Sequence, residues 1–183
     1  MKIRIMALVA LTLSVVCAHD GFAQTPQVPS EVREQRAFFD FLVGEWTIEK
    51  SQTPTGTTAG GNDRYKFRKA LDSGGIFADW YFNRGSKEKP DYTNAIYISG
   101  FDNSAKTWTF YYVSEKSAQL YEGRNENGQW LFYRKFTVNG EELLQRQSWM
   151  AKDGSTLLRK IENSKDAGKT WVLGALITLK RKS

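Results

Sequence analysis

Short clusters rich in glycine, asparagine, aspartate and serine interrupt the chain at close intervals from residue 44 to the C-terminus. Asn127-Gly128, Asn139-Gly140 and Asp153-Gly154 have the composition of tight hairpin turns, in which both central residues adopt positive φ. Between the clusters, apolar and polar residues alternate with the period of two that is typical of half-buried strands. Nine such turns separate ten candidate strands, which predicts an antiparallel up-and-down meander.

A long meander exposes two unpaired edges unless it closes on itself, and a closed barrel removes both edges. All four prolines (26, 29, 54 and 90) precede residue 91, so the second half contains none of the residues that interrupt strand pairing. A barrel of about eight strands already holds one small ligand. The sequence therefore predicts an all-β, antiparallel up-and-down β-barrel of about ten strands.

The segment before the first strand has a different period. Ser30 followed by Glu31 resembles a helix N-cap with an acidic first turn, and a cluster of phenylalanines and a leucine follows at residues 38–42. This predicts a short amphipathic helix over residues 31–42, ended by Gly44, which could plug or cover one end of the barrel.

The first residues have the pattern of a secretory signal. Lys2 and Arg4 precede an apolar stretch over residues 6–17, which is shorter than the ~20 residues that a membrane-spanning helix needs. Small residues allow cleavage after Ala18 or Ala23, and we favour Ala23 because a polar, proline-bearing stretch follows it. We therefore expect a signal peptide over 1–23, a polar linker over 24–30 and one domain over 31–183, with the mature protein in the periplasm or secreted.

Cleavage would remove Cys17 and His19, the only cysteine and the only histidine. The mature chain then lacks an imidazole or thiolate, which excludes histidine-based triads, His/Cys zinc sites and His-ligated haem. We expect no cofactor and no metal. The net charge is +6, but no nucleic-acid motif accompanies the basic run at 180–182, so we interpret it as a solvated tail.

Three motifs point to a family. Residues 41–46 (FLVGEW) resemble the LVGEW opening of the bacterial DUF1579 proteins, which are lipocalin-like (calycin) exported barrels. Ser73-Gly74-Gly75 precedes an aromatic strand as in that family, and residues 164–171 resemble its S-x-D-G-G-K-T-W turn with Ala167 in place of a glycine. The resemblance implies a calycin barrel in which the glycine and tryptophan of FLVGEW close the floor. Related haem-binding barrels similar to nitrobindin use a histidine ligand, so that activity is not carried over.

Period-two alternation selects two arginines as anchors for a ligand. Arg134 shares a face with Trp130, Phe132 and Phe136. Arg146 is selected by similar logic, since it shares a face with Leu144, Ser148 and Met150. An arginine on an apolar stripe suits a ligand carboxylate through paired hydrogen bonds. An internal carboxylate partner, or a rim position with the charge in water, is the commoner explanation for such an arginine.

Aromatic side chains could form the apolar wall of such a pocket, although core packing is their commoner role. The candidates are Trp80, Trp108, Tyr111, Tyr121 and Phe132.

Two further classes stay open. A metal-free enzyme of the isomerase, cyclase or lyase type would use Asp79 or Glu122 as a carboxylate of raised pKa, with Tyr97 as a proton donor. An envelope interaction module would have a filled barrel and an exposed apolar patch. Our leading hypothesis is an exported barrel that binds a small apolar or amphipathic molecule, without nucleic acid or membrane insertion. The alternation shows which residues share a face but not which face is internal, and it leaves the oligomeric state open.

Overall fold

The computed structural model describes residues 29–61, 63–71, 74–83, 88–89 and 92–182. The predicted signal peptide and most of the predicted linker lie outside the described residues. One short helix and one 3-10 turn precede eleven strands, which are α1 (Ser30–Ala37), η1 (Asp40–Leu42), β1 (Gly44–Thr53), β2 (Gly56–Ala59), β3 (Arg64–Ala70), β4 (Gly75–Asn83), β5 (Tyr92–Asp102), β6 (Thr107–Ser114), β7 (Ser117–Glu126), β8 (Gln129–Val138), β9 (Glu141–Asp153), β10 (Thr156–Ser164) and β11 (Val172–Arg181).

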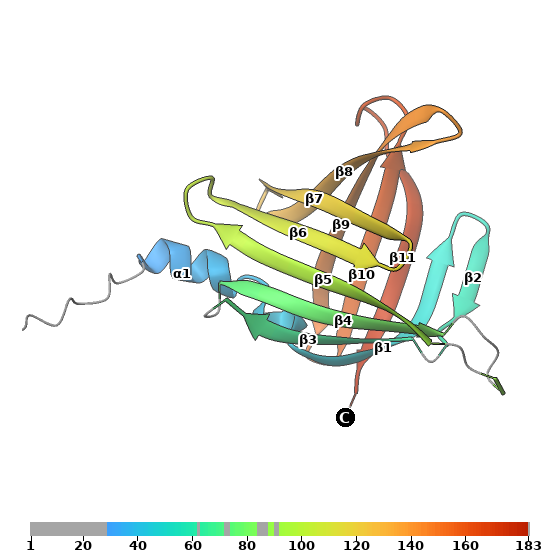
Figure 1. Cartoon of the computed structure of the whole chain (residues 1–183), viewed down its shortest axis with the longest axis horizontal. Coiled ribbons are helices and arrows are strands. Elements are labelled where there is room, and N and C mark those ends of the chain that lie inside the picture. The colour runs from blue at the N-terminus through green and yellow to red at the C-terminus, as the bar shows by residue number, and fades with distance from the viewer. Residues whose placement is uncertain (1–28, 62, 72–73, 84–87, 90–91, 183) are drawn as a thin grey trace, which may run out of the picture.

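Ten of the strands form a closed antiparallel barrel, because β11 pairs with β1 as well as with β10. From β3 to β11 each strand pairs with its successor in the sequence, and β1 pairs with β3. Figure 1 shows the sheet curling from β3 and β4 round to β10 and β11. The predicted up-and-down β-barrel of about ten strands is confirmed.

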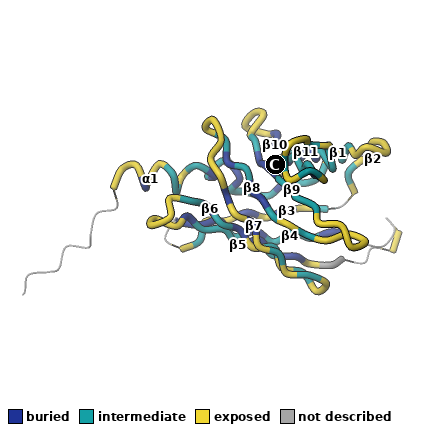
Figure 2. Tube along the Cα trace, turned by 90° about the horizontal axis from the view of Figure 1, so that it is seen from above, coloured by how far each residue is buried: buried dark blue, intermediate teal, exposed yellow. Residues whose placement is uncertain are grey.

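β2 is outside the barrel wall. It pairs only with the second half of β1, and all four of its residues are exposed. Together the two strands form a hairpin that projects beside the barrel (Figures 1 and 2).

Alternation along each strand decides what the barrel encloses. On β4, Ile76, Ala78 and Phe82 are buried, and on β6 Trp108 and Phe110 are buried while Tyr111 is half exposed. Side chains on successive residues point to opposite faces, so one face of each of the ten barrel strands contributes to a largely aromatic interior. In Figure 2 the exposed residues concentrate in the turns and in the β2 hairpin.

The N-terminal segment closes one end of the barrel. The predicted single helix is divided, with α1 ending at Ala37 and η1 following. Phe39 packs edge-on against Trp108 with ring centroids 5.1 Å apart. Indole nitrogens of the barrel fix the segment, since Trp108 Nε1 donates to the Gln35 carbonyl (3.1 Å) and Trp46 Nε1 donates to the Leu42 carbonyl (2.7 Å). The segment is therefore a plug, as its position before the first strand predicts.

Two of the three strongest turn predictions are confirmed by backbone conformation. Asn127-Gly128 and Asn139-Gly140 have φ of 55° and 82°, and of 50° and 83°. Asp153-Gly154 lacks the left-handed conformation, and the Asp153 carboxylate instead accepts bonds from the backbone and hydroxyl of Ser155. Here side-chain hydrogen bonds form the turn in place of a type I′ backbone.

Candidate functional site

A charged side chain lies inside the barrel. Arg159 on β10 is only 6% exposed, and it is surrounded by aromatic and amide side chains from four other strands. We call this group the Arg159 cluster, which comprises Tyr65, Trp80, Tyr97, Gln147, Trp149 and Arg159.

Hydrogen bonds fix the guanidinium in one orientation. Gln147 Oε1 accepts from both Arg159 Nε (3.0 Å) and Nη2 (2.7 Å), and the Tyr65 hydroxyl oxygen accepts from Nη1 (3.0 Å). A guanidinium carries five N–H donors, so these three bonds leave two donors for another acceptor.

Aromatic rings surround the same charge. The Arg159 Cζ lies 5.1 Å from the ring centroid of Trp149, 5.5 Å from that of Tyr97 and 5.7 Å from that of Trp80. Ring faces attract a cation, which offsets part of the cost of removing it from water. None of the ion pairs among the described residues includes Arg159.

Burial and charge act in opposite directions on the neighbouring phenols. Burial raises the pKa of Tyr97 well above its usual value, against the lowering effect of the Arg159 charge, and it raises the pKa of Tyr65 in the same way. Burial by itself lowers the pKa of Arg159, but the surrounding tyrosines more than offset this and raise it. The guanidinium is charged and both phenols are neutral at physiological pH.

Three hydrogen-bonding atoms of the cluster have no partner among the described residues. They are the Tyr97 hydroxyl, the Gln147 amide nitrogen and the Trp80 indole nitrogen. Burying a polar group without a partner typically costs about 1–3 kcal/mol, so such groups are rare in folded interiors. Each of the three can donate a hydrogen bond.

A second group of polar side chains lies further from the plug, around Gln145, which precedes Gln147 by two residues on β9. Gln145 Oε1 accepts from Arg134 Nε (2.9 Å) and from the Tyr121 hydroxyl (3.1 Å), while Gln145 Nε2 donates to Asn163 Oδ1 (2.9 Å). We call these four residues the Arg134 cluster. Arg134 is partly exposed.

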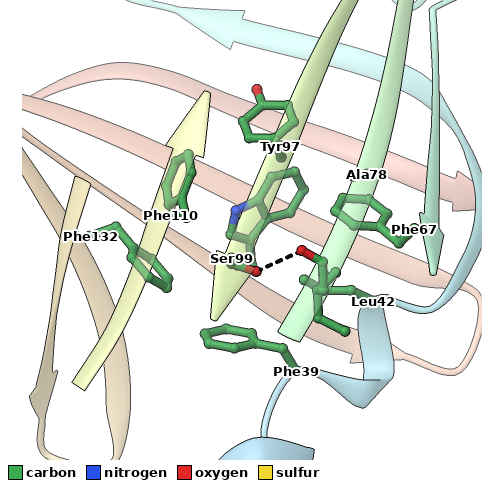
Figure 3. A pocket seen from close by; sticks show the side chains of 10 residues that line it. Phe39, Leu42, Phe67, Ala78, Tyr97, Ser99, Phe110 and Phe132 are labelled. Atoms are coloured by element: carbon green, nitrogen blue, oxygen red, sulfur yellow. Dashed lines mark hydrogen bonds between the residues drawn. The ribbon is translucent and has the colours of Figure 1, made fainter. Parts of the chain in front are cut away.

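A cavity separates the Arg159 cluster from the plug. Its volume is about 30 Å³, and its lining includes Tyr97 and Trp149 of the cluster together with Phe39 and Leu42 of the plug. Figure 3 shows the Tyr97 hydroxyl at the far side from Phe39, with aromatic and aliphatic side chains between them. A cavity of this kind needs about 10–15 Å³ for one water, so the space admits a small group and no more without rearrangement.

The structure places six of the predicted site residues on the inner face of the barrel. Trp80 and Tyr97 belong to the Arg159 cluster, Tyr121 and Arg134 belong to the Arg134 cluster, and Phe132 lines the cavity. Trp108 is also internal, but its contacts with Gln35 and Phe39 make it part of the floor beneath the cavity.

The other four residues are on the outer face. Asp79 and Glu122 alternate with internal residues of β4 and β7, and Tyr111 is 50% exposed. Arg146 alternates with Gln145 and Gln147, and its Nε donates to Glu162 at 2.8 Å. The structure therefore does not bring these four residues to the interior cluster, and it places neither carboxylate candidate there.

Arg159 and Gln147 are central to the site and are missing from the predicted set. Arg159 lies between Leu157 and Ile161 at period two, which is the same pattern that selects Arg134. That signal was available in the sequence. Gln147 carries none, because an isolated glutamine in a strand does not reveal its partner.

Within the described part of the chain, no three histidine, cysteine or acidic residues gather in a way that could hold a metal ion. The same part contains no helix that is both long and apolar enough to cross a membrane.

The fold defines a calycin-like β-barrel. Among solved structures, the S-type phycobiliprotein lyase CPES from Guillardia theta is similar, with a TM-score of 0.51 and 12% identity over 86% of this chain and 99% of that chain. A protein of unknown function from the DUF3598 family of Nostoc punctiforme matches with a TM-score of 0.28 and 9% identity over 81% of this chain and 99% of that chain. No protein-family model and no curated protein matches the chain. At such low identity, the first likeness supports the fold alone.

Proposed function

We propose that this protein is an exported barrel that binds a small apolar or amphipathic molecule inside its wall. The observation that carries the proposal is the Arg159 cluster, in which buried donors without partners lie beside an aromatic-lined cavity. Ligand sites are commonly concave and mostly apolar, with a few polar groups that converge on the ligand. The closed barrel wall surrounds the cluster, which supports the choice of the barrel interior as the site.

Binding of a whole molecule would require the interior to open. The cavity of about 30 Å³ is far below the roughly 300 Å³ at which small-molecule pockets begin. Phe39 and Leu42 are the lining residues that do not belong to the barrel sheet, so displacement of the plug would enlarge the space without breaking any strand pairing. We place the opening movement at α1 and η1.

A matched pair of variants, each with one alanine replaced by leucine, tests the interior site. Ala78 is fully buried and lines the cavity, whereas Ala118 on β7 is exposed. Nile red, a neutral apolar dye, should fluoresce with the unmodified protein and with Ala118→Leu, but much less with Ala78→Leu, whose extra carbons fill the cavity. A melting curve for each variant confirms folding, because overpacking costs about 1–3 kcal/mol. Equal dye binding by both variants would reject an interior site.

Export and DUF1579 membership are parts of the same proposal, supported by the N-terminal pattern and the FLVGEW, Ser73–Gly75 and 164–171 motifs. Expression of the full chain in a bacterium, followed by osmotic shock and mass spectrometry, tests export. The expected product is released by the shock and begins at Gln24. A full-length product that stays with the cytoplasm would contradict it.

Native mass spectrometry of the gently purified protein complements the dye experiment. A co-purifying mass would give the chemical class of the bound molecule directly.

A further inference from the structure

Within the described part of the chain, no carboxylate forms an ion pair with the Arg159 guanidinium. The side chain is almost fully buried, and its described partners are the amide oxygen of Gln147 and the phenol of Tyr65, both neutral. Transfer of an unpaired ion into a protein interior costs several kcal/mol even after relaxation, and buried charges are normally paired. Arg159 is therefore a buried cation without an ion-pair partner among the described residues, and an anion would neutralise it.

Each of the hydrogen-bonding groups of the cluster that has no partner among the described residues can donate a hydrogen bond. Arg159 has two N–H bonds beyond those given to Gln147 and Tyr65, and the Gln147 amide nitrogen can only donate. Tyr97, whose hydroxyl has no partner in the described structure, can donate as well. A ligand group placed here must accept several hydrogen bonds at once.

Shape and charge distinguish between anions. A planar carboxylate matches the fork of a guanidinium and carries one negative charge, which balances the single cation. A phosphate carries up to two negative charges, so it exceeds the single positive charge of the guanidinium. The geometry therefore favours a carboxylate.

We propose that the ligand is an amphipathic monocarboxylate whose carboxylate accepts hydrogen bonds from Arg159, Gln147 and Tyr97, with its apolar part in the cavity as enlarged by displacement of the plug. This inference rests on the proposed function and adds the chemical class and orientation of the ligand. Tyr97 and Trp149 line the cavity, and their rings also lie against the Arg159 guanidinium, so the two halves of the proposed site adjoin at these two side chains.

Octanoate and octanamide form a matched pair of probes, because they differ in charge but little in shape. Titration followed by tryptophan fluorescence is suitable, since Trp80 and Trp149 lie beside the guanidinium. We expect octanoate to bind at least about 10-fold more tightly than octanamide, as a charge-assisted pair replaces a neutral one. Equal affinity for the two, or no binding of octanoate, would overturn the inference.

Tyr97→Phe is the sharpest variant, because it removes a hydroxyl that has no partner in the ligand-free protein. Its melting temperature should not fall, and its affinity for octanoate should fall about 5- to 10-fold with little change for octanamide. Tyr133→Phe is the matched control, since the Tyr133 hydroxyl donates to Glu126 on the outer face. An octanoate affinity unchanged by Tyr97→Phe would contradict the assignment of Tyr97.

Arg159→Met removes the charge itself. We expect octanoate affinity to fall about 30-fold or more, the cost of removing one partner of a buried charge pair. Retained octanoate binding in folded Arg159→Met would overturn the inference. Failure of the inference is distinguishable from failure of the proposed function, because Nile red reports on the interior site without a carboxylate.

Discussion

The Arg159 and Arg134 clusters each combine an arginine with a glutamine and a tyrosine, but they differ in burial and in how many of their hydrogen-bonding groups have partners. Gln145 and Gln147 are neighbours on the inner face of β9, and the amide oxygen of each accepts from one arginine. In the Arg134 cluster the amide also bonds Tyr121 and Asn163, and the arginine is partly exposed. In the Arg159 cluster the arginine is buried, and the Gln147 amide nitrogen and the Tyr97 hydroxyl have no partner within the described structure.

The difference separates a structural role from a binding role. A polar network whose members satisfy one another stabilises the barrel and has little capacity for a ligand. A buried network with unused donors is stable only because the surrounding fold maintains it, and its free capacity is available to an incoming acceptor. Under the proposed function, the ligand therefore binds deep in the interior at the Arg159 cluster, and the Arg134 cluster lies nearer the end opposite the plug.

Removal of each glutamine should produce the largest contrast. Gln147→Leu deprives a buried guanidinium of the acceptor of two bonds, and we expect a loss of about 3 kcal/mol in the free energy of unfolding. Gln145→Leu should cost about 1 kcal/mol, because Arg134 is partly exposed and can turn to water. Urea denaturation of the two variants measures both values. Equal losses would show that Arg159 is hydrated in solution and would remove the distinction between the clusters.

High pH should lower the free energy of unfolding more through the tyrosines of the Arg159 cluster than through Tyr121 of the Arg134 cluster. Burial raises the pKa of Tyr97 and of Tyr65 above 10, so the folded state retains these protons where the unfolded chain releases them. Their contribution to stability is therefore complete below about pH 10 and is lost as the pH rises toward the folded pKa values, at up to about 1.4 kcal/mol per pH unit for each tyrosine.

Tyr97→Phe should flatten this alkaline decline more than Tyr121→Phe does, because burial also raises the pKa of Tyr121 but that residue is less enclosed. The free energy of unfolding, measured at several pH values between about 9 and 11, gives the slopes. An unaltered slope in Tyr97→Phe would mean that this phenol titrates normally in the folded protein.

The fold was predictable because the barrel depends on local signals. Asn127-Gly128 and Asn139-Gly140 specify tight turns by backbone preference alone, and period-two alternation follows from strand geometry. The β2 hairpin was not anticipated, since Gly56 and the threonines around it resemble a loop until they pair with β1. The prediction of one helix over residues 31–42 was only partly correct, because packing of Phe39 against Trp108 requires the chain to turn after Ala37.

The site was harder to predict because alternation is symmetric between the two faces of a strand. Arg134 and Arg146 have equivalent sequence patterns, yet barrel closure places one inside and the other outside with Glu162. Asp79 and Glu122 were candidates for the same reason and also lie outside. The bonds from Arg159 to Gln147 and Tyr65 join residues 12 and 94 positions apart, and no local pattern encodes such contacts.

Arg134→Leu should produce the smallest change in octanoate affinity, and it tests whether the two clusters have different roles. Arg134 is internal and cationic, so it attracts an anionic ligand over a distance, but its Nε donates to Gln145 and its exposure to solvent screens the charge. Octanoate affinity should fall about threefold in Arg134→Leu, an effect that should shrink further at high salt because the attraction is electrostatic. A loss as large as that in Arg159→Met, and insensitive to salt, would instead mean that the carboxylate sits against Arg134, and the two clusters would exchange the roles assigned to them.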